Sequence, residues 1–399
     1  MTSEPRAAWW SRTLKRVLGG AALLAYTLGL AEAYFRVLDP QPLMPRYVTG
    51  TPWGVRGNIP NARYRNHTEE VDVEYRINSQ GLRADRDYPV QKPPGTCRVA
   101  VFGDSFFFGI ELDRRDSFAG QLERRLEERS PRIEVLNFSV GGFGTAEMLR
   151  TFEGFGRRFG ADAVVFSWDD SDLQDNVRSG LFRVDSGRLV AANAEYLPGV
   201  KTLDWLMQYR VYRLIADHSE LYAFVREQSE RLVKEMLRRA RRSDAVGGES
   251  RNDARAAQDG SDGAQSGGAN GGEDAAPVPA DDRKRQALLD LSSDILLRSR
   301  DEVESSGADF YLVEIPFKLS RTRFRSGVDV LPAAVRSQLN VVYTYPALSR
   351  AARPGLELYY ESGQGHLTPT GVSVLVDEAV KSLASSPRLA ACLAAAPQG

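Results

Sequence analysis

Arg98-Val-Ala-Val-Phe-Gly-Asp-Ser-Phe-Phe-Phe-Gly109 is an apolar, β-branched run that stops abruptly at Gly103-Asp104-Ser105. A buried parallel strand that ends at a sheet edge has this pattern. In open α/β sheets, ligands bind outside the carboxyl ends of the strands. Ser105 is therefore a candidate nucleophile, and Gly103 lets another group approach the backbone closely.

Strand-like and helix-like segments alternate after this run. The expected strands are Arg98 to Phe102, Ile133 to Phe138, Ala163 to Trp168, Asp309 to Glu314 and Asn340 to Tyr343. The expected helices are 118–128, 145–159, 284–304, 331–339 and 369–383. This alternation predicts an α/β domain over 96–385, with a flavodoxin-like, five-stranded parallel sheet flanked by helices.

The remaining segments interrupt or flank this domain. We expect residues 37–95 to form an irregular extension with a small edge strand or hairpin at 71–77, and residues 203–242 to form an inserted helical arm. An aromatic stripe on the arm predicts a face that docks near the cleft as a lid: Tyr209, Tyr212, Tyr222 and Phe224. Residues 243–283 are rich in small and polar residues, which predicts disorder, and 386–399 form a flexible tail outside the core.

Composition excludes several function classes. The 52 basic and 53 acidic residues are dispersed and give a net charge of -1, so no basic surface for nucleic acid is expected. The two cysteines, Cys97 and Cys392, permit a disulfide without implying one. Neither metal-ligand spacing nor a dinucleotide-binding glycine pattern occurs, so no metal or cofactor is expected.

The N-terminus has the features of an export signal or a membrane anchor. The uncharged stretch Val17 to Ala31 follows a basic cluster: Arg6, Arg12, Lys15 and Arg16. Such a cluster keeps its side of the helix in the cytoplasm. We expect residues 1–36 to be a single membrane anchor, which places the α/β domain outside the cytoplasm. Alternatively, the segment is a signal cleaved after Ala33 and the protein is secreted.

Four segments together resemble the GDSL/SGNH hydrolase superfamily. They are Gly103-Asp104-Ser105-Phe106, the segment from Asn137 to Thr145, the segment from Val164 to Asn176, and Gly365-His366-Leu-Thr-Pro-Thr-Gly371. The segment Asn78-Ser-Gln-Gly-Leu-Arg83 and the anchor are similar to the membrane-anchored bacterial branch of this superfamily. The resemblance covers most of the chain outside the insertion.

A nucleophilic serine needs a base, and the chain has only three histidines. His67 precedes the sheet and His218 lies on the arm, whereas His366 follows the fifth strand, so His366 is the expected base. The resemblance implies that the backbone N–H groups of Ser105 and Gly142 bind the oxyanion.

The chain departs from the family pattern at two positions. Ser171 stands where the family has an asparagine that donates to the oxyanion, and Asn176 is an alternative donor. Family members have an aspartate two or three residues before the histidine that orients it, and here these positions are Gln364 and Gly363. The acids left as candidates for that role are Glu361, Asp169 and Asp170.

The resemblance implies an extracytoplasmic serine esterase or acyl-transfer enzyme. Its expected substrates are O-acyl esters of envelope glycans or lipids, and its expected partners are a carbohydrate and, through the anchor, the membrane. The alternative is a catalytically degenerate SGNH-fold protein that binds a glycan or a partner protein without turnover.

Overall fold

The computed structural model describes residues 6–39, 41, 47–67, 71–226, 228–229, 280–361 and 365–393. The chain divides into two compact units. One unit combines Met1–Leu43 with Arg210–Val278, and the other combines Met44–Tyr209 with Pro279–Gly399. The second unit contains the sheet predicted from the sequence.

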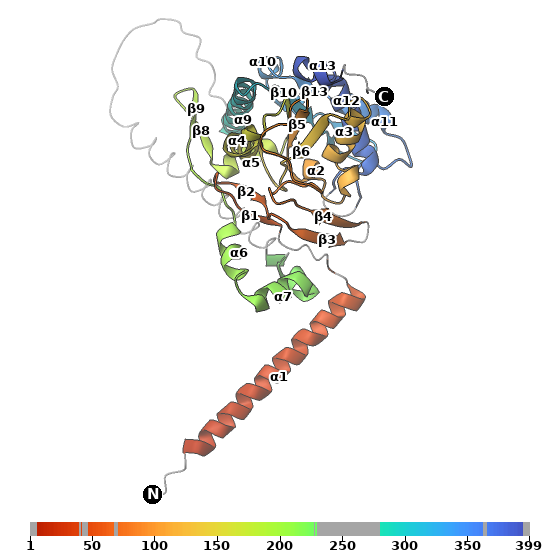
Figure 1. Cartoon of the computed structure of the whole chain (residues 1–399). Helices are drawn as coiled ribbons and strands as arrows, with labels where there is room; N and C mark the ends of the chain where they lie inside the picture. Colours follow the sequence, from red (N-terminus) through yellow and green to blue (C-terminus); the bar gives the residue numbers. More distant parts are fainter. Residues whose placement is uncertain are drawn as a thin grey trace, which may run out of the picture. The chain divides into compact units, whose positions relative to one another are not determined.

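A five-stranded sheet forms the centre of this α/β unit (Figure 1). Its strands are β5 (Cys97–Phe102), β6 (Ile133–Asn137), β7 (Ala163–Trp168), β10 (Asp309–Glu314) and β13 (Val341–Val342). Their spatial order is β13-β10-β7-β5-β6, and all neighbouring pairs are parallel. This is the doubly wound order of flavodoxin-like folds, so the predicted fold class is confirmed.

Helices cover both faces of the sheet and enclose two apolar cores (Figure 1). One face packs against α4 (Thr145–Gly154), α5 (Asp172–Ser179) and α9 (Ala280–Ser305). The other packs against α3 (Phe118–Glu127), α11 (Tyr345–Ala351) and α12 (Pro369–Leu383). Alternate residues of β5 supply both cores, for example Val101 and Phe102, each with no exposed surface.

Short elements complete the α/β unit. The extension holds the antiparallel pairs β1 (Val48–Gly50) with β2 (Arg56–Asn58) and β3 (Arg63–His67) with β4 (Asp72–Arg76), so the expected hairpin is present. The other strand pairs are β8 (Phe182–Asp185) with β9 (Arg188–Ala191) and β11 (Phe317–Lys318) with β12 (Phe324–Arg325). The remaining short helices are α2 (Ser105–Phe108), α6 (Val200–Leu206), α10 (Ala333–Arg336) and the 3-10 turns 114–116, 156–159 and 328–330.

The insertion differs from the sequence expectation in two ways. The expected arm is divided, because α6 ends at Leu206 and a separate helix, α7 (Arg210–His218), belongs to the other unit. The helix α9 already begins at Ala280, within the tract expected to be disordered. Residues 230–279, which hold the rest of the arm and of that tract, lie outside the described residues.

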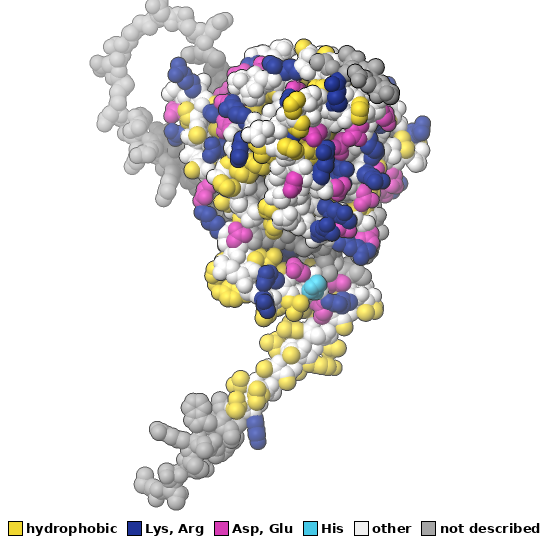
Figure 2. All heavy atoms as spheres, in the orientation of Figure 1, with side chains coloured by type: hydrophobic (Ala, Val, Ile, Leu, Met, Phe, Trp, Pro, Cys, Tyr) yellow, Lys and Arg dark blue, Asp and Glu magenta, His cyan; other side chains and the backbone are white. Residues whose placement is uncertain are grey.

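The unit that contains the N-terminus is built around the helix α1 (Arg6–Leu38). Within the described residues, the segment Leu14–Leu38 of this helix is the one that is long and apolar enough to cross a membrane. Most of its side chains are exposed (Figure 2), and Phe35 near its end is buried. A signal sequence near an N-terminus also meets these criteria of length and composition. Of the aromatic stripe expected on the lid, Tyr212 and Tyr222 contact each other and Phe224 stacks on Phe35 of α1.

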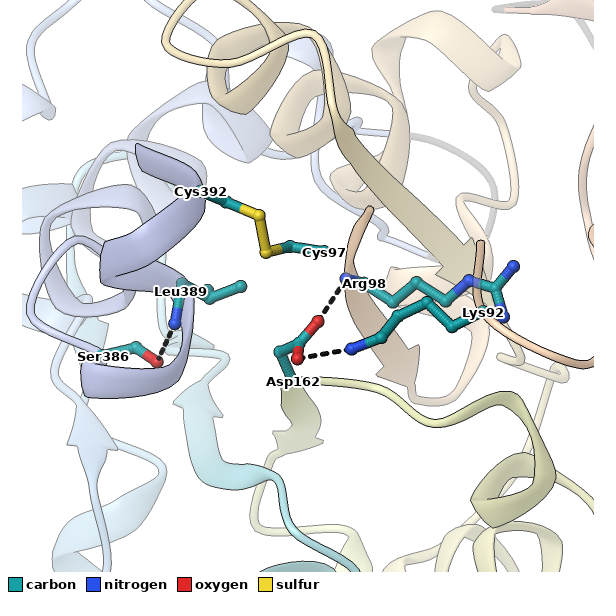
Figure 3. The surroundings of a disulfide bond; sticks show 7 residues. All are labelled: Lys92, Cys97, Arg98, Asp162, Ser386, Leu389 and Cys392. Carbon is teal, nitrogen blue, oxygen red and sulfur yellow. Dashed lines mark hydrogen bonds and ion pairs between the residues drawn. A yellow bond between two sulfur atoms is a disulfide. The ribbon is translucent and has the colours of Figure 1, made fainter. Parts of the chain in front are cut away.

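The C-terminal segment is not a tail outside the core. Pro387–Leu393 forms α13, and Leu389 and Cys392 are buried against the core. Cys392 is joined by a disulfide to Cys97 at the start of β5, with 6.3 Å between their Cα atoms (Figure 3). The apolar positions of the Ala-rich segment lie on one helical face, which explains why it packs rather than extends into solvent.

Removal of this disulfide should destabilise the α/β unit without disabling Ser105, which lies beyond the opposite end of β5. The bond closes a loop with a sequence separation of 295 residues, so it restricts the unfolded chain strongly. We expect the Cys97→Ser/Cys392→Ser variant to lose about 2–4 kcal/mol of unfolding free energy in urea titrations. An unchanged urea midpoint would show that α13 is held by packing alone.

Candidate active site

Ser105 begins α2 directly beyond the carboxyl end of β5, and its side chain is partly exposed. The N-cap of this helix is Asp104, whose carboxylate accepts a hydrogen bond from the Phe106 N–H at 2.9 Å. A side chain at Gly103 would place its Cβ 2.5 Å from the Phe107 Cβ, so the turn requires glycine. Because Asp104 caps the helix, the Ser105 hydroxyl is left available for other contacts.

His366 lies against Ser105. Its Nε2 is 2.8 Å from the Ser105 Oγ, which is hydrogen-bond distance, although the two residues are 261 positions apart. The ring is 3% exposed and stands edge-on to Phe106, with 5.0 Å between the ring centroids. This is the arrangement in which an imidazole takes a proton from a serine hydroxyl.

The acid that contacts His366 is Glu111. Its Oε2 lies 3.0 Å from the His366 Nδ1, and the Glu111 side chain is almost completely buried. The three acids expected for this role bind elsewhere: Glu361 pairs with Arg321, Asp170 pairs with Arg325, and Asp169 accepts the Ser171 N–H. Position 364 lies outside the described residues.

The sequence around Glu111 carries a signal of a functional acid. Glu111 is the only charged residue in the otherwise apolar run Phe106 to Leu112. A charged residue in a buried run needs a partner, because burial of an unpaired carboxylate is costly. The acid in contact with His366 is thus neither the one nearest to it in sequence nor one at the end of β7.

The backbone of Glu111 is held in a conformation that side chains rarely adopt. Its φ is 71°, a left-handed value that favours glycine and costs of the order of 1–3 kcal/mol for other residues. The Tyr75 hydroxyl of β4 accepts the Glu111 N–H at 2.8 Å, and the Tyr360 hydroxyl donates to the Glu111 carbonyl at 3.4 Å. Strain of this kind is typical of functional positions.

Arg83 of the extension holds the loop that contains Glu111. Its buried guanidinium donates to the carbonyls of Phe108, Gly109 and Leu112, with 2.7 Å to the Gly109 oxygen. It also stacks on the Tyr75 ring at 4.7 Å. Burial lowers the pKa of Arg83 to about 10, so the group remains charged at neutral pH. The extension thus supplies both Arg83 and Tyr75 to the loop that carries Glu111.

The loop after β6, which contains Gly142, is joined to the serine turn. The Val140 N–H donates to the Gly103 carbonyl at 3.0 Å, which joins the two loops. Gly142 has a φ of 77°, and among the described residues no acceptor is found for its N–H. The same holds for the N–H of Ser105, in the first turn of α2. Both amides are therefore available to a ligand oxygen.

Arg56 of β2 supports the Gly142 turn. Its Nη2 donates to the Gly142 carbonyl at 2.6 Å and to the Glu147 Oε1 at 3.0 Å. The buried Glu147 in turn accepts the Gly144 N–H at 3.2 Å. A charge-assisted network therefore fixes the carbonyl of Gly142, and with it the direction of the neighbouring peptide planes.

The two residues considered as a third oxyanion donor make other contacts. Ser171 is exposed at the start of α5, and its hydroxyl hydrogen-bonds the Asp169 carboxylate. Asn176 is buried, accepts the Ala146 N–H at 2.9 Å and donates to Ser292, so it caps α4 and does not point into the site. The structure thus brings Ser105 and His366 into contact, and it joins the loop that contains Gly142 to the serine turn through Val140 and Gly103. Among the described residues, no contact joins Ser171 to Ser105 or His366.

Buried carboxyl groups surround the turn between β7 and α5. Asp172 accepts the Thr145 N–H at 2.8 Å and the Asp169 N–H at 3.0 Å, so it links α4 to the end of β7. Burial, and then the nearby Asp169, raise the pKa of Asp172 and of Asp104 well above their usual range. The described residues contain no cluster suited to a metal ion.

Asp175 should make stability depend on pH. Burial raises its pKa from the ordinary 3.8 to about 6, against the opposing effect of Arg178. The folded state therefore binds the proton of the Asp175 carboxyl more tightly than the unfolded state does. The resulting contribution to the free energy of unfolding is complete below the unfolded pKa of 3.8, and it is lost as the pH rises through about 6. Asparagine does not titrate, so the free energy of unfolding of Asp175→Asn should rise relative to that of the wild type, by of the order of 1–3 kcal/mol from acidic to neutral pH. Urea titrations that show the same difference at both pH values would contradict this assignment.

The known proteins of similar structure are distant from this chain in sequence. No protein-family model matches the sequence, and neither does any of the curated proteins. The structure is similar to TesA, with 13% identity, a TM-score of 0.35, and coverage of 72% of this chain and 97% of that chain. It is also similar to a G-D-S-L family lipolytic protein from Desulfitobacterium hafniense, with 11% identity, a TM-score of 0.35, and coverage of 72% and 99%.

A further similar structure is a catalytic variant of an acetylxylan esterase from Geobacillus stearothermophilus. The identity is 11%, the TM-score 0.36, and the coverage 73% of this chain and 96% of that chain. At such low sequence identity, the chemistry of this protein has to be inferred from its own residues.

Proposed function

We propose that this protein is a membrane-anchored serine esterase of the SGNH type, with Ser105, His366 and Glu111 as its catalytic triad. The observation that carries the proposal is the continuous chain from Ser105 Oγ to His366 Nε2 at 2.8 Å and from His366 Nδ1 to Glu111 Oε2 at 3.0 Å. Two distant loops and one strained acid meet at hydrogen-bond distance, which is the geometry of an activated serine.

The proposed reaction follows from these contacts. The Ser105 oxygen attacks the ester carbonyl carbon while His366 takes the hydroxyl proton, and Glu111 stabilises the imidazolium. The tetrahedral oxyanion is held by the N–H groups of Ser105 and Gly142. His366 then gives the proton to the leaving alcohol oxygen as the carbon–oxygen bond breaks, which leaves an acyl-serine.

Water, or the hydroxyl of an acceptor, completes the cycle. His366 removes a proton from that nucleophile, the new bond forms at the acyl carbon, and the proton returns to Ser105 as the acyl-serine bond breaks. The missing third donor at Ser171 reduces the expected rate, since removal of one oxyanion donor costs roughly 10²–10³ in kcat. Transfer of the acyl group to water makes the protein an esterase, and transfer to a sugar hydroxyl makes it an acyltransferase.

The location of the substrate is inferred from two features. The apolar part of α1 follows a basic cluster in the first turns of the same helix, which favours a domain outside the cytoplasm. The Cys97–Cys392 disulfide fits an oxidising compartment. Cleavage after Ala33 would remove Glu32, which binds the inserted helices, so retention of the anchor is favoured. Together with the sequence motifs, this location suits O-acyl esters of envelope glycans or lipids.

A fluorophosphonate probe tests the proposal because it reacts only with an activated serine. We expect the wild type and the control Ser320→Ala, at an exposed turn, to be labelled equally, and Ser105→Ala to remain unlabelled. Absence of labelling in folded wild-type protein would contradict catalysis. That result would fit the alternative, an SGNH fold that binds a glycan or a partner protein without turnover.

A further inference from the structure

Glu32, near the end of α1, caps a helix of the insertion. Its carboxylate accepts hydrogen bonds from the Ser219 hydroxyl at 2.7 Å and from the N–H groups of Glu220 and Leu221, each at 3.1 Å. These amides begin the helical residues 220–226. A carboxylate at a helix N-terminus satisfies donors that the helix leaves unpaired. An acid that would be costly in a membrane helix is thereby paired.

Two further contacts fix the same junction. Arg36 donates to the His218 carbonyl, the last residue of α7, at 2.6 Å, and it pairs with Glu32 at 2.7 Å. The rings of Phe35 and Phe224 stack with their centroids 4.6 Å apart. The end of α1 therefore holds the C-terminus of one inserted helix and the N-terminus of the next.

α7 is amphipathic, and among the described residues its apolar face is largely exposed. Val211, Leu214 and Ile215 have helical spacing and are 70%, 63% and 43% exposed. The inner side of the helix is occupied, since the Tyr212 hydroxyl lies 2.6 Å from that of Tyr222. The third side is charged, with Arg210, Arg213 and Asp217.

The depth at which α7 would lie relative to a membrane follows from the position of Glu32, which contacts the residues just after this helix. The span ends at Leu38, six residues beyond Glu32. At 1.5 Å per residue, Glu32 lies about 9 Å before the end of the apolar helix. If α1 crosses a bilayer, this places α7 at the boundary between acyl chains and headgroups, where amphipathic helices bind.

We propose that α7 is a second membrane contact, whose face Val211, Leu214 and Ile215 inserts into the lipid interface of the leaflet where α1 ends. The partner is a phospholipid surface. Arg210 and Arg213 stand beside this face and suit anionic headgroups. The inference rests on the proposed anchoring by α1, and it gives the insertion a role at the membrane.

Site-specific quenching in the full-length protein, reconstituted in phosphatidylcholine/phosphatidylglycerol vesicles, tests this contact. Single cysteines replace Leu24 in α1, Leu214 on the apolar face and Asp217 on the charged side, and each carries an environment-sensitive fluorophore. The native cysteines are joined to each other and do not react without reductant. Quenchers are iodide in water and nitroxides attached to the lipid acyl chains.

We expect nitroxide lipids to quench the Leu214→Cys label about threefold more strongly, or more, than the Asp217→Cys label. Iodide should quench the Asp217→Cys label more strongly than the Leu214→Cys label. Equal iodide quenching at both positions would overturn the inference. Protection of Leu214→Cys from both quenchers would also overturn it, in favour of docking on protein. A Leu24→Cys label untouched by nitroxide lipids would refute the anchoring itself, so the two failures are distinguishable.

Discussion

Glu111→Gln should lower kcat for a simple ester such as p-nitrophenyl acetate by about 10³–10⁴. The amide is nearly isosteric with the carboxylate, so the contact to the His366 Nδ1 at 3.0 Å can persist. An amide that accepts from the ring nitrogen has no charge to stabilise the imidazolium, and one that donates to it selects the wrong tautomer. KM should change little, because Glu111 lies behind His366 rather than against the substrate.

Glu361→Gln is the matched control. Glu361 is the acid nearest to His366 in sequence, but its carboxylate pairs with Arg321 at the surface. We expect wild-type activity from this variant. Comparable losses in both variants would mean that Glu111 has no special role.

Glu111→Gly separates catalysis from folding. Glycine adopts the φ of 71° without strain, so this variant should be about as stable as the wild type, while it loses the acid. Inactive protein with an unchanged urea midpoint would show that the loss is chemical. A Glu111→Gly variant that retained activity would refute the triad.

Arg83→Lys should reduce both stability and kcat. A lysine cannot reproduce the fork that reaches the carbonyls of Phe108, Gly109 and Leu112. Buried carbonyls left unpaired cost about 1–3 kcal/mol each, so we expect about 2–4 kcal/mol of destabilisation in urea titrations. The freed loop misplaces Glu111, and misplacement by about 1 Å can lower kcat by about 10² while KM is unchanged.

The control for Arg83 is Arg86→Lys, since Arg86 stacks on Tyr88 and pairs with Glu134 in a more exposed position. This variant should keep both its stability and its kcat. If Arg83→Lys lost stability while the folded enzyme kept its full kcat, Arg83 would have a structural role only.

The sheet was predictable because its strands are continuous apolar runs. Both faces of β5, β7 and β10 are covered by helices, so nearly every residue is buried and the sequence shows an uninterrupted signal. The ends of these runs also located Ser105, and the topology located His366. These inferences need only the order of the elements and the direction of parallel strands.

The acid was not predictable in the same way. The contact between Glu111 and His366 depends on a left-handed φ and on Arg83 and Tyr75 from the extension. No local propensity indicates such a conformation in a glutamate. The disulfide of α13 likewise depends on a cysteine 295 positions away, and the sequence pattern alone does not identify this pairing.

The most direct test of the triad compares kcat/KM for Glu111→Gln, His366→Ala and the double variant, with p-nitrophenyl acetate as substrate. Residues that act as one unit show strongly non-additive effects. We predict that the double variant is no less active than His366→Ala alone, within about threefold, since Glu111 acts only through the imidazole. Losses that multiply in the double variant would mean that Glu111 and His366 act independently, which contradicts the triad.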